Sequence, residues 1–146
     1  MNKFVKVLLY LWQLPQHVIG LALILFLKAR KRFLHIGSGA LIGFWEYEPK
    51  GRFGRFISGG SFGEYIILPP RDDYVQTVPH EYGHSLQSRA WGPLYLIVIG
   101  IKSAVFNNLW DRLFHKDWPS EKRRGWYYNR WPEKQADRLG GVKREY

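Results

Sequence analysis

The longest apolar run of the chain lies at its beginning. It covers residues 4–27 and is interrupted by Lys6 and by a polar stretch at residues 13–17. No formally charged side chain occurs from residue 7 to residue 27, and about 20 such residues are enough to cross the hydrocarbon core of a bilayer. The pattern therefore predicts a single membrane-spanning helix at this end of the chain.

The basic segment Lys-Ala-Arg-Lys-Arg at residues 28–32 ends this run. We therefore predict a hydrophobic membrane anchor with a basic stop over residues 1–32, and no small-residue cleavage site follows it as in a signal peptide. Four cations after the run, against Lys3 and Lys6 before it, favour a cytoplasmic position for the rest of the chain. Two alternatives are an amphipathic helix at the membrane interface and a buried helix kinked at Pro15.

Residues 33–70 have a different pattern. Short runs of aromatic and β-branched residues are separated by glycines and prolines, which is typical of a small, mostly antiparallel sheet. The first run includes Ile36 beside Gly37 and Gly39, and residues 52–58 form another candidate strand. The last run, residues 60–68, could form the rim of a cleft and pair with an extended peptide, or it could be an ordinary strand.

Residues 71–91 are predicted to form a helix. Its candidate N-caps are Asp72, Asp73 and Thr77. Pro79 would occupy the first turn or kink the helix, because proline lacks a backbone donor and clashes with the preceding turn. We therefore expect the residues after Pro79 to lie close to the helix start. Gly83 costs about 1 kcal/mol relative to alanine in a helix interior, which indicates a close approach by a ligand, the sheet or another helix.

Three further helical segments follow. The apolar run at residues 94–101 is too short to span a membrane and is predicted as a buried helix segment, with a re-entrant or interfacial piece as the alternative. Apolar residues recur at helical spacing in residues 105–118. A last helix is predicted from Pro132, which suits a first helical position, to about Leu139, before a glycine pair.

Length and composition limit the chemistry. A chain of 146 residues is enough for one folded domain, which we place at residues 33–146. It contains no cysteine, so a metal site would have to use histidine and carboxylate ligands. The formal net charge of +10 indicates an anionic partner, unless these cations only solvate the surface. We expect anionic membrane lipid and not nucleic acid, because no nucleic-acid-binding motif is present.

The helix predicted at residues 71–91 contains the segment His80-Glu81-Tyr82-Gly83-His84. Side chains four residues apart lie on the same face of a helix, so His80 and His84 can direct their imidazoles at one metal ion. Glu81 lies beside them, where its carboxylate could take a proton from a water on the metal.

A catalytic zinc site needs a third protein ligand and an open position. No further histidine occurs in residues 85–93, so a carboxylate from the last helix is the natural candidate. Glu133 and Asp137 are four residues apart and share a face. We expect Glu133 to be the third ligand and Asp137 to accept a hydrogen bond from a ligating histidine. Ala136 between them would let the last helix lie against the motif helix.

The two motifs, His80-Glu81-x-x-His84 and Glu133-x-x-Ala136-Asp137, resemble those of the gluzincin zinc metallopeptidases. They are similar to the membrane CaaX prenyl protease and heat-shock protease group and to the minigluzincins. The resemblance implies an α+β, zincin-like domain that binds one Zn²⁺ through the two histidines and Glu133. It also implies that Glu81 acts as general base and acid in the hydrolysis of a peptide or protein substrate.

The residue that would stabilise the oxyanion of the transition state is not assigned by the motifs. The candidates that lie between them are His115, Tyr127, Tyr128 and Arg130. The sequence therefore predicts a membrane-anchored zinc metallopeptidase. The alternatives are a zinc-stabilised membrane protein or latent scaffold without turnover, and a pair of helix histidines that bond to Glu133 and Asp137 without a metal.

Overall fold

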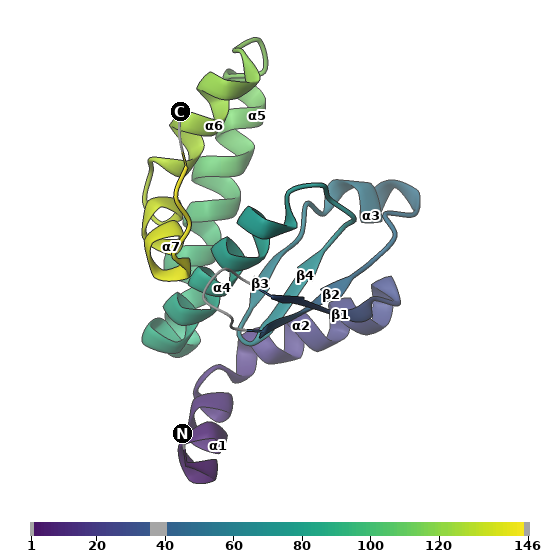
Figure 1. Cartoon of the computed structure of the whole chain (residues 1–146), viewed down its shortest axis with the longest axis vertical. Coiled ribbons are helices and arrows are strands. Elements are labelled where there is room, and N and C mark those ends of the chain that lie inside the picture. The colour runs from purple at the N-terminus through teal and green to yellow at the C-terminus, as the bar shows by residue number, and fades with distance from the viewer. Residues whose placement is uncertain (1, 36–40, 145–146) are drawn as a thin grey trace.

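The structure is a computed structural model that describes residues 2–35 and 41–144. Its fold is α+β, with a small four-stranded sheet between helices (Figure 1). The helices are α1 (Lys3–Trp12), α2 (Leu14–Leu27), α3 (Gly51–Phe56), α4 (Tyr74–Trp91), α5 (Trp110–Phe114), α6 (Ser120–Tyr128) and α7 (Glu133–Gly140). Between α4 and α5 lie a 3₁₀ turn, η1 (Gly92–Leu94), and two π-helical segments, η2 (Leu96–Gly100) and η3 (Lys102–Leu109). The strands are β1 (Arg30–His35), β2 (Leu41–Glu46), β3 (Gly60–Phe62) and β4 (Tyr65–Leu68).

The sheet is mixed, with the strand order β1-β2-β4-β3. The β1–β2 and β3–β4 pairs are antiparallel, as expected, whereas β2 and β4 run parallel and place Trp45 opposite Ile67. The candidate strand at residues 52–58 is wrong, because residues 51–56 form α3. Glycines at positions 51 and 54 disfavour a strand there. Ile36, Gly37 and Gly39 lie outside the described residues.

The two faces of the sheet are covered by different helices. Ile66 and Leu68 of β4 pack with Val78 of α4. The intervening Ile67 packs with Ile24 of α2 on the opposite face. Alternate side chains of a strand point to opposite faces, so β4 is buried on both sides and anchors both helices. β3 is left at the edge of the sheet, next to α4.

The single N-terminal membrane helix is wrong, because this run forms two helices that are bent by 81°. The break lies at Gln13, and Pro15 occupies the first turn of α2. Proline lacks the backbone donor and clashes with the carbonyl four residues earlier, here that of Leu11, so α1 cannot continue. None of the single helices in residues 2–35 and 41–144 is long and apolar enough to span a bilayer. By length and composition, two bent pairs pass this test: α1 with α2, and residues 74–94 with 96–114.

The first half of α2 buries polar residues, whereas its second half packs Ile24 against the sheet. Its buried residues are Gln16, His17, Gly20 and Ile24. His17 Nε2 accepts a hydrogen bond from the backbone of Glu64 at 3.1 Å, and the Gln16 amide donates to the carbonyl of Gly92. The apolar residues Val18, Leu21 and Leu25 are exposed. The polar stretch within the N-terminal run therefore faces the protein, and the apolar side faces outward.

The segment at residues 94–101 is only partly buried. Tyr95 and Ile99 are buried, as predicted for this stretch, but Leu94, Ile97 and Ile101 are exposed. Its helical path continues through η3 into α5, where the apolar residues at helical spacing are exposed as well (Val105, Phe106, Leu109, Trp110, Leu113, Phe114). One side of this long element is therefore an apolar surface stripe.

The motif helix α4 begins at Tyr74, with Asp73 as its N-cap residue. Its first turn therefore precedes Pro79, and the expectation that the residues after Pro79 would lie near the helix start is wrong. The helix continues through Pro79, which is buried in its interior. The Pro79 carbonyl lies against Gly140 of α7, where a Cβ would overlap it.

Helices α4 and α7 approach each other closely at two glycines. A Cβ added at Gly83 would overlap the backbone carbonyl of Ala136, and one added at Gly140 would overlap that of Pro79. Of the three reasons considered for Gly83, namely a ligand, the sheet or another helix, the structure shows the close approach of another helix. The approach matters because Glu133 is the first residue of α7.

We predict that Gly83→Ala destabilises the protein by about 1–3 kcal/mol, because α4 and α7 must separate to admit the methyl group. Urea unfolding followed by circular dichroism measures the change. Gly100→Ala is the matched control, since its added Cβ would find its nearest neighbour, the Tyr95 carbonyl oxygen, at 3.8 Å. That control should leave stability unchanged or raise it by up to about 1 kcal/mol. Equal stability of Gly83→Ala and the wild type would contradict the packing argument.

Candidate metal centre

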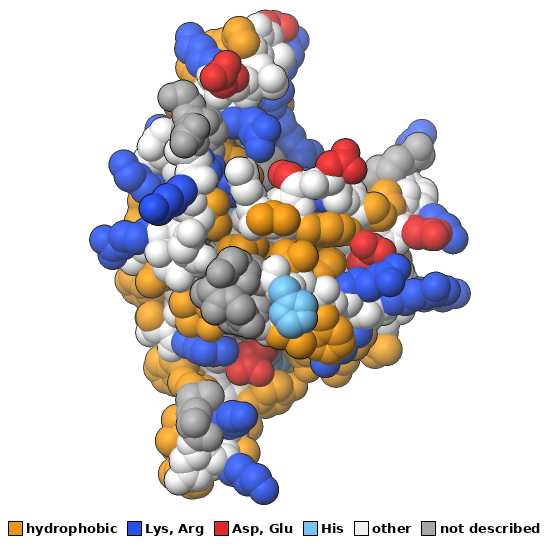
Figure 2. Space-filling view, viewed as in Figure 1, with side chains coloured by type: hydrophobic (Ala, Val, Ile, Leu, Met, Phe, Trp, Pro, Cys, Tyr) orange, Lys and Arg blue, Asp and Glu red, His pale blue; other side chains and the backbone are white. Residues whose placement is uncertain are grey.

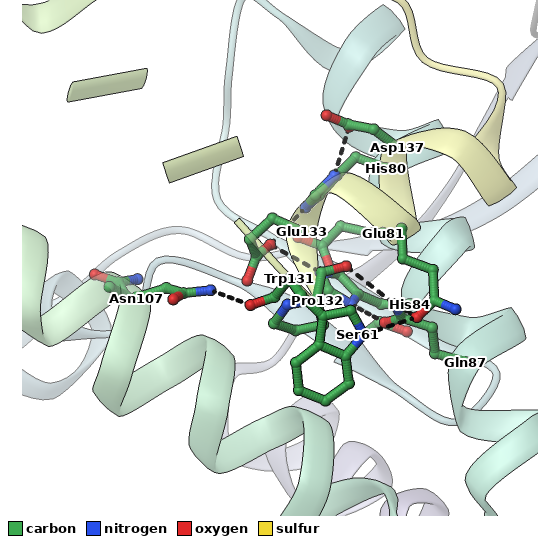
Figure 3. A network of polar contacts seen from close by, with 12 residues as sticks. Ser61, His80, Glu81, His84, Gln87, Asn107, Trp131, Pro132, Glu133 and Asp137 are labelled. Atoms are coloured by element: carbon green, nitrogen blue, oxygen red, sulfur yellow. Dashed lines mark hydrogen bonds and ion pairs between the residues drawn. The ribbon is translucent and has the colours of Figure 1, made fainter. Parts of the chain in front are cut away.

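Three side chains from two helices converge on one point. Nε2 of His80 and Nε2 of His84 on α4 lie 3.2 Å and 3.1 Å from the same oxygen, Oε2 of Glu133. Figure 3 shows the three side chains pointing toward one another. One ligand atom from each residue lies within 4.8 Å of the other two. The separation of the histidines by four residues places them on one face of α4, and the α4–α7 packing brings Glu133 to them.

The cluster is buried, with exposed fractions of 4% for His80, 5% for His84 and 0% for Glu133. The second carboxylate oxygen of Glu133, Oε1, has no hydrogen-bond partner among the described residues. A buried carboxylate oxygen without a partner is costly unless a cation or a donor satisfies it. The cluster therefore has the acceptor atoms that a metal ion would satisfy.

The Nδ1 atom of His80 is bonded on the side away from the cluster. It lies 2.7 Å from Oδ1 of Asp137, one turn after Glu133 on α7. Because an ionised carboxylate can only accept, Nδ1 carries a proton, so the neutral form of His80 would have its lone pair on Nε2, the nitrogen that faces the cluster. Asp137 thus holds the place expected for it beside His80.

The side chain of Gln87 fixes the orientation of His84, as Asp137 does for His80. Nδ1 of His84 lies 2.7 Å from Oε1 of Gln87, whose Nε2 donates to the carbonyl of Pro132 at 3.0 Å. The Pro132 bond fixes which end of the amide faces His84, so Gln87 must accept from His84 Nδ1. Both histidines therefore turn Nε2 toward Glu133, which is the orientation needed to bind a metal ion through Nε2.

The distances between these atoms fit a tetrahedral metal site. Zinc lies about 2.0–2.1 Å from histidine nitrogen and carboxylate oxygen, which gives about 3.3 Å between neighbouring ligand atoms. The distances of 3.1 Å and 3.2 Å from Glu133 Oε2 to the two Nε2 atoms agree with that value. The buried group of His80, His84 and Glu133 could hold a metal ion.

Asp137 is itself held by an arginine. Arg144 Nε donates to Oδ2 at 2.8 Å and its Nη2 to Oδ1 at 3.1 Å. The same guanidinium stacks 3.5 Å from the centre of the Tyr128 ring, and that ring meets the His80 ring edge to face at 5.2 Å. The last residues of the described chain therefore close a ring of contacts around His80.

Protonation of the metal-free cluster follows from these contacts. Burial alone lowers the pKa of His80, but hydrogen bonds to Asp137 and Glu133 outweigh it and raise the pKa to about 9. Burial opposes ionisation of Glu133, yet hydrogen bonds to the two histidines hold its pKa well below the ordinary value. At neutral pH the metal-free protein therefore keeps a proton on the cluster that a metal ion must displace.

Glu81 lines a cleft with a volume of about 500 Å³. His80 and His84 line this cleft beside it, and the edge strand β3 forms part of one wall. The opposite wall consists of residues from η3, α5 and α6. A half-buried carboxylate thus faces the same space as the two histidines, and the free edge of the sheet borders that space.

The four candidates for oxyanion stabilisation fall into two groups. Tyr127 and Tyr128 line the cleft, and burial raises the pKa of each, so both keep the hydroxyl proton that a donor needs. His115 is buried against Trp118, with ring centroids 3.9 Å apart, and does not line the cleft. Arg130 does not line it either and lies over the ring of Trp126 at 4.5 Å. The structure therefore leaves the two tyrosines as candidates.

Three supporting residues were missed by the sequence analysis. Gln87 follows His84 by three residues, a spacing at which helix side chains meet, so a signal existed for it. Arg144 lies beyond α7 and gave no signal. Asn107 is fully buried on η3 and donates to the carbonyl of Trp131 at 3.2 Å, which ties η3 to the loop before Glu133.

Comparison of the chain with protein-family models, with curated proteins and with solved structures gives no match.

We predict that binding of zinc to the metal-free protein at pH 7 releases close to one proton. The raised pKa of His80 keeps the cluster protonated from the ordinary histidine value of 6.5 up to about 9, so proton release should vanish above about pH 9. Isothermal titration calorimetry in two buffers of different ionisation enthalpy measures the number of protons. Equal heats in both buffers at pH 7 would contradict this prediction.

The variants for this experiment test whether zinc binds at the cluster and not at another buried histidine. Glu133→Gln should weaken zinc binding by more than about 100-fold, and Asp137→Asn by about 10–100-fold. His115→Gln removes a buried histidine outside the cleft and should leave the affinity unchanged.

Proposed function

We propose that the protein is a zinc-dependent metallopeptidase that acts at a membrane surface. The observation that carries the proposal is the convergence of His80, His84 and Glu133, because the two histidines of this group line a cleft together with Glu81. Zinc is the ion of choice because two imidazoles and one carboxylate with nearly tetrahedral spacing are typical of catalytic zinc sites. The resemblance of both motifs to the gluzincins supports the same activity.

The chemistry divides between the ion and the chain. Zinc bound by the three ligands would supply a Lewis acid that polarises a peptide carbonyl and activates water. Glu81 accepts the proton of the attacking water and passes it to the leaving amine. Tyr127 and Tyr128 keep their hydroxyl protons and are the donors in the cleft for the developing oxyanion. Asp137 and Gln87 hold the two imidazoles in place.

The edge strand β3 supports a peptide as the substrate. It is the last strand in the sheet order and lines the cleft, and an extended peptide can add to an edge strand through backbone hydrogen bonds. Ser61 of β3 is bonded to Ser85 of α4 at 2.8 Å, which holds the strand over the motif helix. A peptide that paired with β3 would therefore pass above Glu81 and the two histidines.

The exposed apolar surfaces support attachment to a membrane. Leu21 and Leu25 on the outer side of α2 are 46% and 69% exposed, and η2, η3 and α5 present a second apolar stripe. Figure 2 shows hydrophobic side chains at the surface along α1 and α2, with Lys and Arg side chains among them. Large exposed apolar patches beside cations suit insertion into the interface of an anionic bilayer. We place the domain on the cytoplasmic face, following the basic segment at residues 28–32.

A scaffold that binds zinc without turnover is the second candidate. It is favoured by the buried network around Asp137 and Arg144, which would stabilise the C-terminal part of the fold whether or not catalysis occurs. The two candidates differ in whether Glu81 has a chemical task. This difference can be measured directly.

We predict that Glu81→Gln lowers the rate of peptide hydrolysis by about 10²–10⁴-fold while zinc content stays unchanged, because the amide cannot accept the proton. Cleavage of an unstructured protein by the zinc-loaded full chain, followed by mass spectrometry, measures the rate. Glu121→Gln removes an exposed carboxylate of α6 that does not line the cleft and should retain the wild-type rate. Hydrolysis by Glu81→Gln at the wild-type rate would remove the role assigned to Glu81. A wild-type chain that binds zinc and cleaves no substrate would favour the scaffold.

We predict that the protein floats with vesicles that contain phosphatidylglycerol and binds phosphatidylcholine vesicles more weakly. The double variant Leu21→Gln/Leu25→Gln should lower the affinity for anionic vesicles by about tenfold or more, since two side chains no longer enter the lipid. Val75→Gln, at a 72% exposed position of α4, is the matched control and should bind as the wild type does. Vesicle binding that is unaffected by the double variant would exclude the outer side of α2 as the attachment surface.

A further inference from the structure

The end of the cleft that lies away from the histidines is basic. Arg112 of α5 and Arg123 and Arg124 of α6 line it. We propose that Arg112 and Arg124 select peptide substrates that carry acidic side chains on one side of the cleaved bond. The proposal rests on the proposed function for the cleavage step, whereas its binding step can be tested without hydrolysis.

The charge at this end of the cleft is not compensated by the protein. Arg123 pairs with Asp111, with Nη2 and Oδ2 2.7 Å apart, so these two charges cancel. Arg112 and Arg124 take part in none of the ion pairs formed among the described residues. Both residues are exposed. Two cations therefore face the cleft with their carboxylate-binding capacity unused.

The wall of the cleft opposite the arginines carries no charged side chain that could bind them in place of a peptide. It is formed by the segment from Ser58 to Phe62, which contains only serine, glycine and phenylalanine. Asn108 of η3 donates to the hydroxyl of Ser58 at 3.5 Å, so the two walls approach each other at that point. A peptide held along β3 would therefore meet the arginines from the side of α5 and α6.

Helix geometry sets the position of the acidic residue. Arg123 and Arg124 precede Tyr127 and Tyr128 by four residues each, so each pair shares a face of α6 and is separated by about 6 Å along the axis. Tyr128 contacts the His80 ring at 5.2 Å, which places the tyrosine end of α6 at the metal centre. An extended peptide advances about 3.3 Å per residue. A peptide residue beside the tyrosines is therefore followed, about two residues further along the peptide, by the residue that lies beside the arginines.

An acidic peptide fits this end of the cleft better than a nucleic acid does. The cations lie inside a cleft that leads to the cluster of His80, His84 and Glu133 and is bordered by a strand edge with peptide-pairing capacity. Figure 2 shows the Lys and Arg side chains of this view dispersed over the surface, interleaved with hydrophobic side chains, and not gathered into one continuous stripe. A phosphate backbone is recognised by such a stripe. Guanidinium groups bind carboxylates through paired, charge-assisted hydrogen bonds.

The binding experiment uses the full chain with Glu81→Gln, loaded with zinc, so that no peptide is consumed. Fluorescence anisotropy compares an unstructured fluorescent peptide that contains a pair of aspartates with its asparagine counterpart. We expect the aspartate peptide to bind about tenfold more tightly, and the preference to disappear in Arg112→Glu/Arg124→Glu. The double variant Lys116→Glu/Lys122→Glu makes the same charge change at two exposed sites that do not line the cleft and should retain the preference. Equal affinity for the two peptides, or an unchanged preference in the arginine double variant, would overturn the proposal. A fluorescent single-stranded oligonucleotide that bound more tightly than the aspartate peptide would overturn it as well.

The cleavage experiment separates this proposal from the proposed function. Wild-type protein is incubated with a mixed peptide library, and mass spectrometry locates the cleaved bonds. Enrichment of Asp and Glu two to three residues to one side of these bonds, and its reversal toward Lys and Arg in the arginine double variant, would support acidic selection. Cleavage without such enrichment would overturn the selection and leave the peptidase standing. Charge-dependent binding without any cleavage would support the acidic-peptide site and overturn the peptidase.

Discussion

The contact of α4 with α7 at two glycines is the constraint on which the rest of the structure depends. Gly83 meets the backbone of Ala136, and Gly140 meets that of Pro79, so the two helices approach without intervening side chains. This approach brings the first turn of α7 to the face of α4 that carries His80 and His84. A methyl group at either glycine would separate the helices, and Glu133 would move away from the two imidazoles.

Once Glu133 is buried between two histidines, the surrounding contacts follow from the cost of burying charge. A buried carboxylate must be paired, and one of its oxygens has no partner among the described residues. Asp137, held by Arg144, and Gln87, held by the Pro132 carbonyl, fix the outer nitrogens of both imidazoles. Without a metal the cluster retains a proton, as the raised pKa of His80 shows. A metal ion would therefore compete with this proton for the cluster. Metal affinity and protonation are thus two aspects of one electrostatic balance.

The polar and apolar sides of the helices divide the surface into two regions of different polarity. The segment from η2 to α5 lines the cleft with residues such as Ser103 and Asn108 and presents leucine, isoleucine and phenylalanine on the other side. On α2, Gln16 and His17 are buried against the sheet and η1, and apolar side chains such as Leu21 face outward. One molecule can therefore keep a polar cleft in water while its outer helices contact lipid. In the proposed function, substrates would be cleaved close to the membrane surface.

The sequence by itself determined the α+β class, the motif helix and the grouping of His80, His84 and Glu133, because these depend on helical periodicity and on the short list of residues that bind metal. It also indicated, through Gly83, that something approaches the motif helix closely. Only the tertiary structure decided that this partner is α7, that α2 buries Gln16 and His17, and that Arg144 reaches Asp137. The break at Gln13 and the helix that continues through Pro79 also departed from expectation. Periodicity describes which residues share a face of one element, whereas contacts between distant elements depend on how those faces pack together.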